Sequence, residues 1–249
     1  MCSSDLERIE IAREITDQIV SRYGPDIIGI VVYGSVAKGE DAEHSDLELW
    51  IATTDQLPSR EVLCIYQGLS VELFYGLAEG FIADAQHVDP FWPIRADMRR
   101  SFLVLYERDD FFERLRQAAR MLNEDDFLQA MRVRMLRTYD LVGKLRNAWT
   151  QHDHYGVLAI ARDIAFSFAL LIGLANRCYY PSQRGMYHQS KQMPLQPEYY
   201  AELVEVAGGF TNTDPEQVYR AAIELWEQVR SFVERLGIVW ERDELIIWV

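Results

Sequence analysis

The sequence lacks the features that would place it in a membrane or in an oxidising compartment. No run reaches the ~18 consecutive apolar residues of a membrane span, and the opening MCSSDLERIE lacks the basic and then apolar pattern of a signal peptide. Cys2, Cys64 and Cys178 are odd in number and scattered, so neither a disulfide framework nor a paired-cysteine metal site is expected. We therefore expect a cytoplasmic protein with no membrane partner.

Basic residues are also scarce. The 249 residues include 25 Lys and Arg against 39 Asp and Glu, which gives a net charge of −14. Nucleic-acid binding draws its affinity from basic contacts to phosphates, so this balance opposes a DNA or RNA partner and favours a cationic one. Because 49% of the residues are hydrophobic and 12% aromatic, the chain can build proper cores and is not expected to be disordered.

The most informative stretch is YGSVAKGEDAEHSDLEL, residues 33–49. An apolar run over 27–32 ends at Gly34-Ser35, and the chain resumes at Asp46 with alternating acidic and apolar residues. This pattern predicts a strand, a tight turn, a short loop and a second strand. Since successive side chains of a strand point to opposite faces, Asp46 and Glu48 share one face while the leucines between and after them anchor the other.

Two carboxylates held side by side repel each other, and a folded protein rarely keeps such a pair without a cation. Mg²⁺ is typically bound by one or two carboxylates together with substrate phosphates. Gly34 lets the backbone approach a ligand, and the following N–H groups and the Ser35 hydroxyl can receive phosphate oxygens. The stretch therefore predicts a site for Mg²⁺ and a nucleotide. The alternative is an amphipathic edge strand with solvated acids.

A third acid, Glu72, lies in the apolar segment SVELFY, which predicts another strand. A Glu inside such a strand is costly to bury unless it has a partner. If this strand lies beside the strand of Asp46, Glu72 joins the two acids. Otherwise Glu72 faces solvent on an edge strand.

The remaining pattern predicts an α+β fold. A first helix is expected over 5–23, further strands over 62–66, 69–75 and 102–106, and a short helix over 78–87. From residue 111 the spacing is helical, over 111–122, 125–151, 154–179, 197–207 and 215–236. We expect a mixed β-sheet domain with flanking helices at residues 1–123, followed by an α-helical bundle domain at residues 124–249.

The segment TYDLVGKLRN lies in the longest predicted helix. Asp140 and Lys144 are four residues apart and so share a face of that helix. Taken alone, they predict an intrahelical salt bridge worth about 0.3–0.5 kcal/mol.

The stretch that begins at Gly34 resembles the pattern of the DNA polymerase β-like nucleotidyltransferase superfamily. This pattern is Gly-Ser, then ten residues, then alternating acidic and apolar residues. Several segments in order resemble, more closely, the kanamycin (aminoglycoside 4'-O-) nucleotidyltransferases. They are YGSVAKG, SDLEL, VELFY, the extended Pro-Phe-Trp-Pro corner before FLVLYERD, DLVGKLRN and LIGLANRCYY. The resemblance covers most of the chain and implies that its N-terminal domain binds the nucleotide and metal.

The resemblance implies a role for each matching residue of that domain. Gly34 and Ser35 belong to the phosphate-binding turn, and Asp46 and Glu48 are the metal-binding, catalytic acids. Glu72 matches an acid on the neighbouring strand that serves the metal and the antibiotic.

In the helical domain, the resemblance makes Lys144 a contact of the nucleotide phosphates. We also expect Lys38 of the first domain to help steady the triphosphate. Asp140 falls where the family places its general base, usually a glutamate, and contacts the substrate there. A second acid that the family can carry one turn earlier is Leu136 here. The acceptor side of the pocket, and the antibiotic range with it, is therefore expected to differ.

The activity so implied is Mg²⁺-dependent transfer of a nucleoside monophosphate, AMP from ATP, to a hydroxyl of an aminoglycoside antibiotic, the 4'-OH, with pyrophosphate leaving and antibiotic resistance as the result. The acidic charge suits a substrate that carries several ammonium groups. The relatives also imply a homodimer with a cleft lined by both subunits.

Three alternatives belong to other classes. A transferase acting on another small molecule, such as a lincosamide, would share the site. A nucleic-acid nucleotidyltransferase should carry a basic surface, which the net charge opposes. An antitoxin or interaction module of this fold would tolerate loss of the acids and is generally shorter, whereas here all the acids and a large helical half are present.

Overall fold

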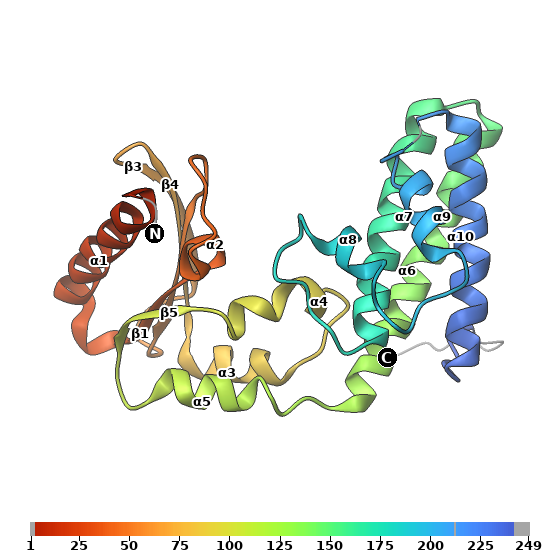
Figure 1. Ribbon diagram of the computed structural model, residues 1–249. Helices are drawn as coiled ribbons and strands as arrows, with labels where there is room; N and C mark the ends of the chain where they lie inside the picture. The colour runs from red at the N-terminus through yellow and green to blue at the C-terminus, as the bar shows by residue number, and fades with distance from the viewer. Residues whose placement is uncertain (1–2, 212, 242–249) are drawn as a thin grey trace. The chain divides into compact units, whose positions relative to one another are not determined.

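The computed structural model describes residues 3–211 and 213–241, which form two compact units (Figure 1). Unit 1 comprises the chain up to His87 together with Arg95–Leu122. Unit 2 comprises Val88–Ile94 and the chain from Asn123 onward. A short piece of the N-terminal half thus belongs to the helical unit. That residues 1–123 and 124–249 divide the nucleotide and substrate roles stays a prediction.

Unit 1 is built on a five-stranded sheet in the order β3-β4-β2-β1-β5. The strands are β1 (Ile27–Tyr33), β2 (Leu47–Thr53), β3 (Arg60–Tyr66), β4 (Leu69–Leu77) and β5 (Leu103–Glu107). β2 runs parallel to β4, and the other neighbours are antiparallel. The sheet is therefore mixed, as the sequence predicts.

Strand alternation divides the core of unit 1 into two layers. On one face, helix α1 (Ser3–Tyr23) packs with Ile15 and Ile19 on the inward leucines of β2, and Figure 1 shows it lying along the sheet. On the other face, α3 (Ala78–Gln86) and α5 (Phe111–Ala118) cover Trp50, whose ring stacks on Phe81 at 4.8 Å. Glu48 shares the face of Trp50.

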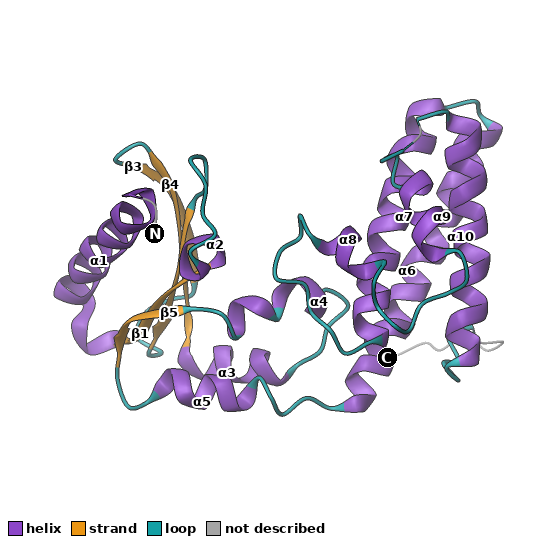
Figure 2. Ribbon diagram, in the orientation of Figure 1, coloured by secondary structure: helices purple, strands orange, loops and turns teal. Residues whose placement is uncertain are grey.

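Unit 2 is helical. Its elements are α6 (Glu124–Thr150), α7 (His154–Ala175), α8 (Met186–Ser190), α9 (Tyr200–Ala207) and α10 (Pro215–Arg235). We call Val88–Ile94 the inserted piece of unit 2, and α4 (Trp92–Arg95) begins in it. Asn123, Asp153 and Asp214 each accept a backbone N–H two or three residues on, which fixes where the long helices begin. Figure 2 shows the three long helices side by side.

Helix α7 forms the core of unit 2. By length and composition it could cross a membrane, but 67% of its most apolar window is buried inside the protein. Gly173 allows the inserted piece to approach, since a Cβ there would lie 2.8 Å from the Pro93 Cβ. Such burial is typical of the central helix of a bundle.

The α+β fold class is confirmed, with local corrections. Gly34-Ser35 opens a five-residue helix, α2 (Gly34–Lys38), where the sequence predicts a tight turn. Trp92–Arg95 is helical where the two prolines suggest an extended corner, because proline is tolerated in the first turn of a helix. α8 is not predicted by the pattern, and α7 ends at Ala175 rather than at Tyr179.

Candidate active site

Three carboxylates gather on one face of the sheet of unit 1, and we call Asp46, Glu48 and Glu72 the acid cluster. Asp46 directly precedes β2 and Glu48 lies within it. Glu48 pairs in register with Glu72 of β4 on one side and with Tyr33 of β1 on the other. The expectation that the strand of Glu72 lies beside the strand of the paired acids is confirmed.

The electrostatics of Glu48 are those of a crowded acid. Burial, together with the smaller effects of the charges of Asp46 and Glu72, raises the pKa of Glu48 to about 7. A hydrogen bond from the Tyr33 hydroxyl and the charge of Lys38 act in the opposite direction. The pKa of Glu72 is also raised, by burial and then by Glu61 and Asp46. The cluster therefore holds more negative charge than its surroundings stabilise.

Glycine is required at position 34 both by the backbone conformation and by the lack of space for a side chain. Its φ of 72° lies in the left-handed region, and a Cβ there would fall 2.1 Å from Glu48 Oε2. The carboxylate of Glu48 thus lies against the backbone at the start of α2. No side chain larger than hydrogen fits at this position.

Helix α2 places Ser35 and Lys38 next to the acid cluster. Ser35 is half-buried as the second residue of the helix, and the backbone N–H of Gly39 caps the far end. Lys38 is ion-paired with Asp97, a buried acid whose other oxygen accepts a hydrogen bond of 2.9 Å from Ser101. Lys38 therefore has a carboxylate partner while also lying near enough to influence Glu48.

The loop between α2 and β2 is held by one buried arginine of α1. Arg8 donates to Asp41 Oδ2 and to the carbonyl oxygens of Ala42 and Glu43, each at 2.9 Å. Its exposed fraction is only 7%. The five-donor guanidinium thereby fixes the chain just ahead of Asp46.

The acid cluster fits a Mg²⁺ ion that arrives with a nucleotide. In the part of the chain that the structure describes, no three His, Cys, Asp or Glu side chains are arranged to hold a metal by themselves. Mg²⁺ needs only one or two protein carboxylates, with waters and substrate phosphates completing its shell. The mutual repulsion at Glu48 is what a cation would relieve.

The predicted base and phosphate contact lie in unit 2, on α6. Lys144 Nζ is 2.7 Å from Asp140 Oδ2, and their side chains are 59% and 66% exposed. The intrahelical salt bridge predicted from the spacing is therefore present. Asp140 also lines a groove of about 560 Å³ with Arg134, Arg137 and Asp163.

Sequence reasoning missed three polar residues near these sites. Tyr33 could have been identified from its position at the end of the strand before Gly34-Ser35. No feature of the sequence indicates Asp97. Arg134 is buried on α6, where burial and then the charge of Arg137 lower its pKa to about 10. Its guanidinium lies 4.5 Å from the ring centre of Phe91. A buried arginine cannot be told from an exposed one by helical spacing alone.

Comparison with known proteins agrees with this architecture. A solved nucleotidyltransferase-like protein from Exiguobacterium sibiricum 255-15 superposes with a TM-score of 0.59 over 90% of this chain and 74% of that one. At 14% identity this likeness shows the fold alone. The fold is thus that of the nucleotidyltransferase-like proteins.

Sequence similarity identifies more specific relatives than the fold does. Two curated relatives, each named aminoglycoside nucleotidyltransferase (4'), come from Staphylococcus aureus and a Bacillus species. Each is 26% identical to this chain over 235 residues, which cover 94% of the chain and 92% of the relative.

The family described as KNTase C-terminal domain matches residues 109–239. Since this match spans more than half of the sequence, the chain belongs to that family. The resemblance to the kanamycin nucleotidyltransferases is therefore confirmed, and with it the expectation of an enzyme.

Proposed function

We propose that the protein transfers a nucleoside monophosphate, AMP from ATP, to a hydroxyl of an aminoglycoside, the 4'-OH, and releases pyrophosphate. One observation carries the proposal: Glu48 lies beside Asp46 and Glu72 with a raised pKa, directly against the backbone of Gly34. Such a site is suited to a cation bridging protein acids and phosphate. The names of the curated relatives support the acceptor class.

In this proposal Asp46 and Glu48 would hold Mg²⁺, which supplies charge neutralisation at the α-phosphate when bound. Tyr33, which pairs with Glu48 across the sheet, would help to orient this carboxylate. Gly34 and Ser35 leave the backbone and a hydroxyl open to phosphate oxygens. Lys38 assists with the triphosphate, and this requires it to share its charge between Asp97 and the nucleotide.

Asp140 is proposed to take the proton of the acceptor hydroxyl, a role worth ~10² to 10⁴ in rate. It is one methylene, about 1.5 Å, shorter than the glutamate usual in the family. Since more than half of the side chains of Asp140 and Lys144 is exposed, each can turn from the other towards a substrate at little cost. Lys144 would then contact the phosphates.

The carboxylates of Glu72 and Asp140 are suited to pair with the ammonium groups of an aminoglycoside. Glu72 is proposed to contact the antibiotic or the metal, and Asp140 to contact the antibiotic beside its role as base. Leu136 is 49% exposed and lines the same groove as Asp140, so an apolar surface stands where relatives can carry an acid. We expect this difference to alter the range of antibiotics.

We further propose a cytoplasmic homodimer without nucleic-acid or membrane partners. The net charge of −14 supports the exclusion of nucleic acid. Light scattering of the purified protein should give twice the mass of one chain across working concentrations. A stable monomer would contradict the dimer and any cleft shared by two chains.

The activity is tested by pyrophosphate release from ATP and Mg²⁺ with a panel of aminoglycosides, a lincosamide and a control lacking any acceptor. Mass spectrometry should show one nucleoside monophosphate added to an aminoglycoside that carries a 4'-OH. A matched aminoglycoside without this hydroxyl should not react. Modification of the lincosamide alone, or release without an acceptor, would contradict the proposal.

A further inference from the structure

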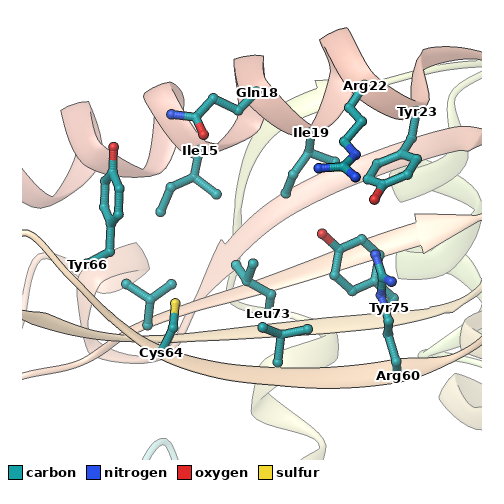
Figure 3. Close-up of a pocket in the computed structure, with 12 residues that line it drawn as sticks. Ile15, Gln18, Ile19, Arg22, Tyr23, Arg60, Cys64, Tyr66, Leu73 and Tyr75 are labelled. Atoms are coloured by element: carbon teal, nitrogen blue, oxygen red, sulfur yellow. The ribbon is translucent and has the colours of Figure 1, made fainter.

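A second cavity lies in unit 1, on the face of the sheet opposite the acid cluster. It has a volume of about 360 Å³ and lies between α1 and the β3–β4 half of the sheet (Figure 3). Val71, Leu73 and Tyr75 of β4 line it, whereas Glu72 belongs to the acid cluster. Because side chains alternate along a strand, the sheet itself separates this cavity from the acid cluster.

The middle of the cavity is apolar. Ile15 and Ile19 of α1 form one wall, and Leu73 and Val62 form the other. Helix α1 buries the central strands but leaves the inner side of the edge strand β3 open, so Cys64 remains exposed at this wall. A mostly apolar wall with a few convergent polar groups is the usual make-up of a small-molecule site.

One end of the cavity is cationic. The guanidinium of Arg60 lies 4.5 Å from the ring centre of Tyr75 and 5.8 Å from that of Tyr23, and that of Arg22 lies 5.3 Å from the Tyr23 ring. Arg60 also donates a hydrogen bond to the Tyr23 hydroxyl, which lowers the pKa of this phenol. In Figure 3 the Arg22 guanidinium and the Tyr75 hydroxyl point between helix and sheet at this end.

Neither arginine has an acidic partner in the part of the chain that the structure describes. Among residues 3–211 and 213–241, no carboxylate lies within ion-pair distance of Arg22 or Arg60, although acids outnumber basic residues in the chain. The aromatic rings hold the two guanidinium groups in place without neutralising their charge. Two positioned, uncompensated arginines are suited to bind a carboxylate or a similar anion.

At the other end of the cavity, the lining residue Tyr66 is held by an exposed acid of α1. Glu14 of α1 accepts hydrogen bonds from the Tyr66 hydroxyl at 2.7 Å and from Gln67 at 3.3 Å. These bonds link the helix to the turn between β3 and β4. Among the described residues that line the cavity, charge is therefore present only at the arginine end, which sets the orientation of an anionic ligand.

We propose that this cavity binds a small organic anion with an apolar body, such as a medium-chain or aryl carboxylate. The carboxylate lies at Arg22 and Arg60, and the apolar body lies along Ile19 and Leu73 towards Cys64. This site is independent of the nucleotidyl-transfer proposal, because it lies on the opposite face of the sheet and its test needs no catalytic turnover.

Cys64 supplies a reporter for occupancy. In a Cys2→Ser/Cys178→Ser background, the alkylation rate of Cys64 by N-ethylmaleimide is measured with octanoate as the probe. Octanoate should slow alkylation at least fivefold at saturation, with half the effect at about 1 mM or below, the range expected for a ligand of this size. Octan-1-ol, which has the same apolar body without the charge, should need about tenfold more.

Variants assign the binding to the two arginines. Arg22→Gln/Arg60→Gln should raise the half-effect concentration of octanoate about tenfold or more, and Arg22→Gln alone should raise it by less. Arg13→Gln, an exposed arginine of α1 outside the cavity, is the matched control and should leave it unchanged. Circular dichroism and the melting temperature check that each variant is folded.

A filled cavity gives a second readout. In Cys64→Trp the larger side chain occupies the open wall, and calorimetric titration with octanoate should show binding to the parent protein but not to this variant. The proposal is overturned if octanoate gives no protection at about tenfold the expected concentration, if octan-1-ol protects equally well, or if the double arginine variant binds octanoate as the parent does.

Discussion

The acid cluster of unit 1 and the Asp140–Lys144 pair of unit 2 were both singled out by the sequence, but the structure gives them different physical characters. Glu48 is half-buried, with a raised pKa and a contact that only glycine at 34 permits. Asp140 and Lys144 form an exposed ion pair on one helix. The first arrangement is costly to the folded protein, whereas the second costs it almost nothing.

The two regions therefore differ in how strongly their structure alone indicates a function. Unsatisfied charge and a forced glycine are hard to explain by stability alone, so the acid cluster points to a ligand within unit 1 by itself. A surface ion pair has a sufficient structural explanation worth about 0.3–0.5 kcal/mol. Its proposed catalytic role rests on the family resemblance, so variants of the two regions are compared separately.

The largest effect is expected at the acid cluster. Asp46→Asn and Glu48→Gln should each abolish turnover while the fold remains intact, because each removes a carboxylate proposed to bind the metal. Asp55→Asn, an exposed acid after the far end of β2, is the control and should retain activity. Steady-state kinetics at saturating Mg²⁺ decide the matter. More than about a tenth of wild-type kcat in either cluster variant would make the metal assignment wrong, since loss of a metal ligand costs several kcal/mol.

Asp140→Asn should lower kcat by ~10² or more with nucleotide affinity nearly unchanged, since it removes the proposed base. A role limited to the salt bridge predicts almost unchanged catalysis and a stability loss under ~0.5 kcal/mol. Rapid-quench kinetics and thermal melts distinguish the two. Turnover within about threefold of wild type would leave Asp140 with its structural role only.

Asp140→Glu is the informative companion, because it restores the side chain usual in the family. Partial activity in this variant, with near-total loss in Asp140→Asn, would indicate a base held at a defined distance from the acceptor. Equal, complete loss in both would indicate a site that tolerates no added methylene.

Gly34→Ala and Gly39→Ala form a matched pair within unit 1. Their φ values of 72° and 67° make both substitutions strained by about 1 kcal/mol, but only a Cβ at 34 meets Glu48 Oε2, at 2.1 Å. Gly34→Ala should therefore lower kcat tenfold to hundredfold, since small displacements of a reacting group are costly, roughly 10² per Å. Gly39→Ala should lower stability alone, as melting curves would show. Equal activity losses would contradict a special contact at Gly34.

The smallest effect concerns pH. The folded state raises the pKa of Glu48 from 4.5 to about 7, so it binds this proton more tightly than the unfolded chain does. The stabilisation that comes from this tighter proton binding is complete below the pKa of Glu48 in the unfolded chain. It is lost as the pH rises through about 7. Urea unfolding in a chelator should show wild type losing stability between about pH 5 and pH 8, and Glu48→Gln losing less. Identical pH profiles would contradict the crowding of this acid.

The sequence was a good guide to the elements that bury an apolar face. β1, β2 and β4 and the long helices follow from periodicity, and the neighbouring positions of Glu48 and Glu72 follow once β2 and β4 pair. It failed where local geometry decides. Helix α2 begins at a left-handed glycine and is only five residues long, so no periodic signal exists for it.

The partners within the site could not be predicted for a similar reason. Tyr33 meets Glu48 through strand register, and Lys38 meets Asp97 across more than fifty residues of sequence. Arg134 is buried by Phe91 of the inserted piece, which belongs to unit 2 although it precedes α5 in the chain. Such contacts depend on packing between distant segments, which a single sequence does not encode in any pattern of spacing.

Metal binding by the acid cluster is tested most directly by equilibrium binding of Mn²⁺, in place of Mg²⁺. It is measured by electron paramagnetic resonance in the presence of a non-hydrolysable ATP analogue. We expect tight binding by wild type and by Asp140→Asn. In Asp46→Asn and Glu48→Gln we expect the affinity to fall more than about tenfold, since each variant loses one carboxylate ligand. Unchanged Mn²⁺ affinity in both acid-cluster variants, or loss of affinity in Asp140→Asn alone, would contradict metal binding by the acid cluster.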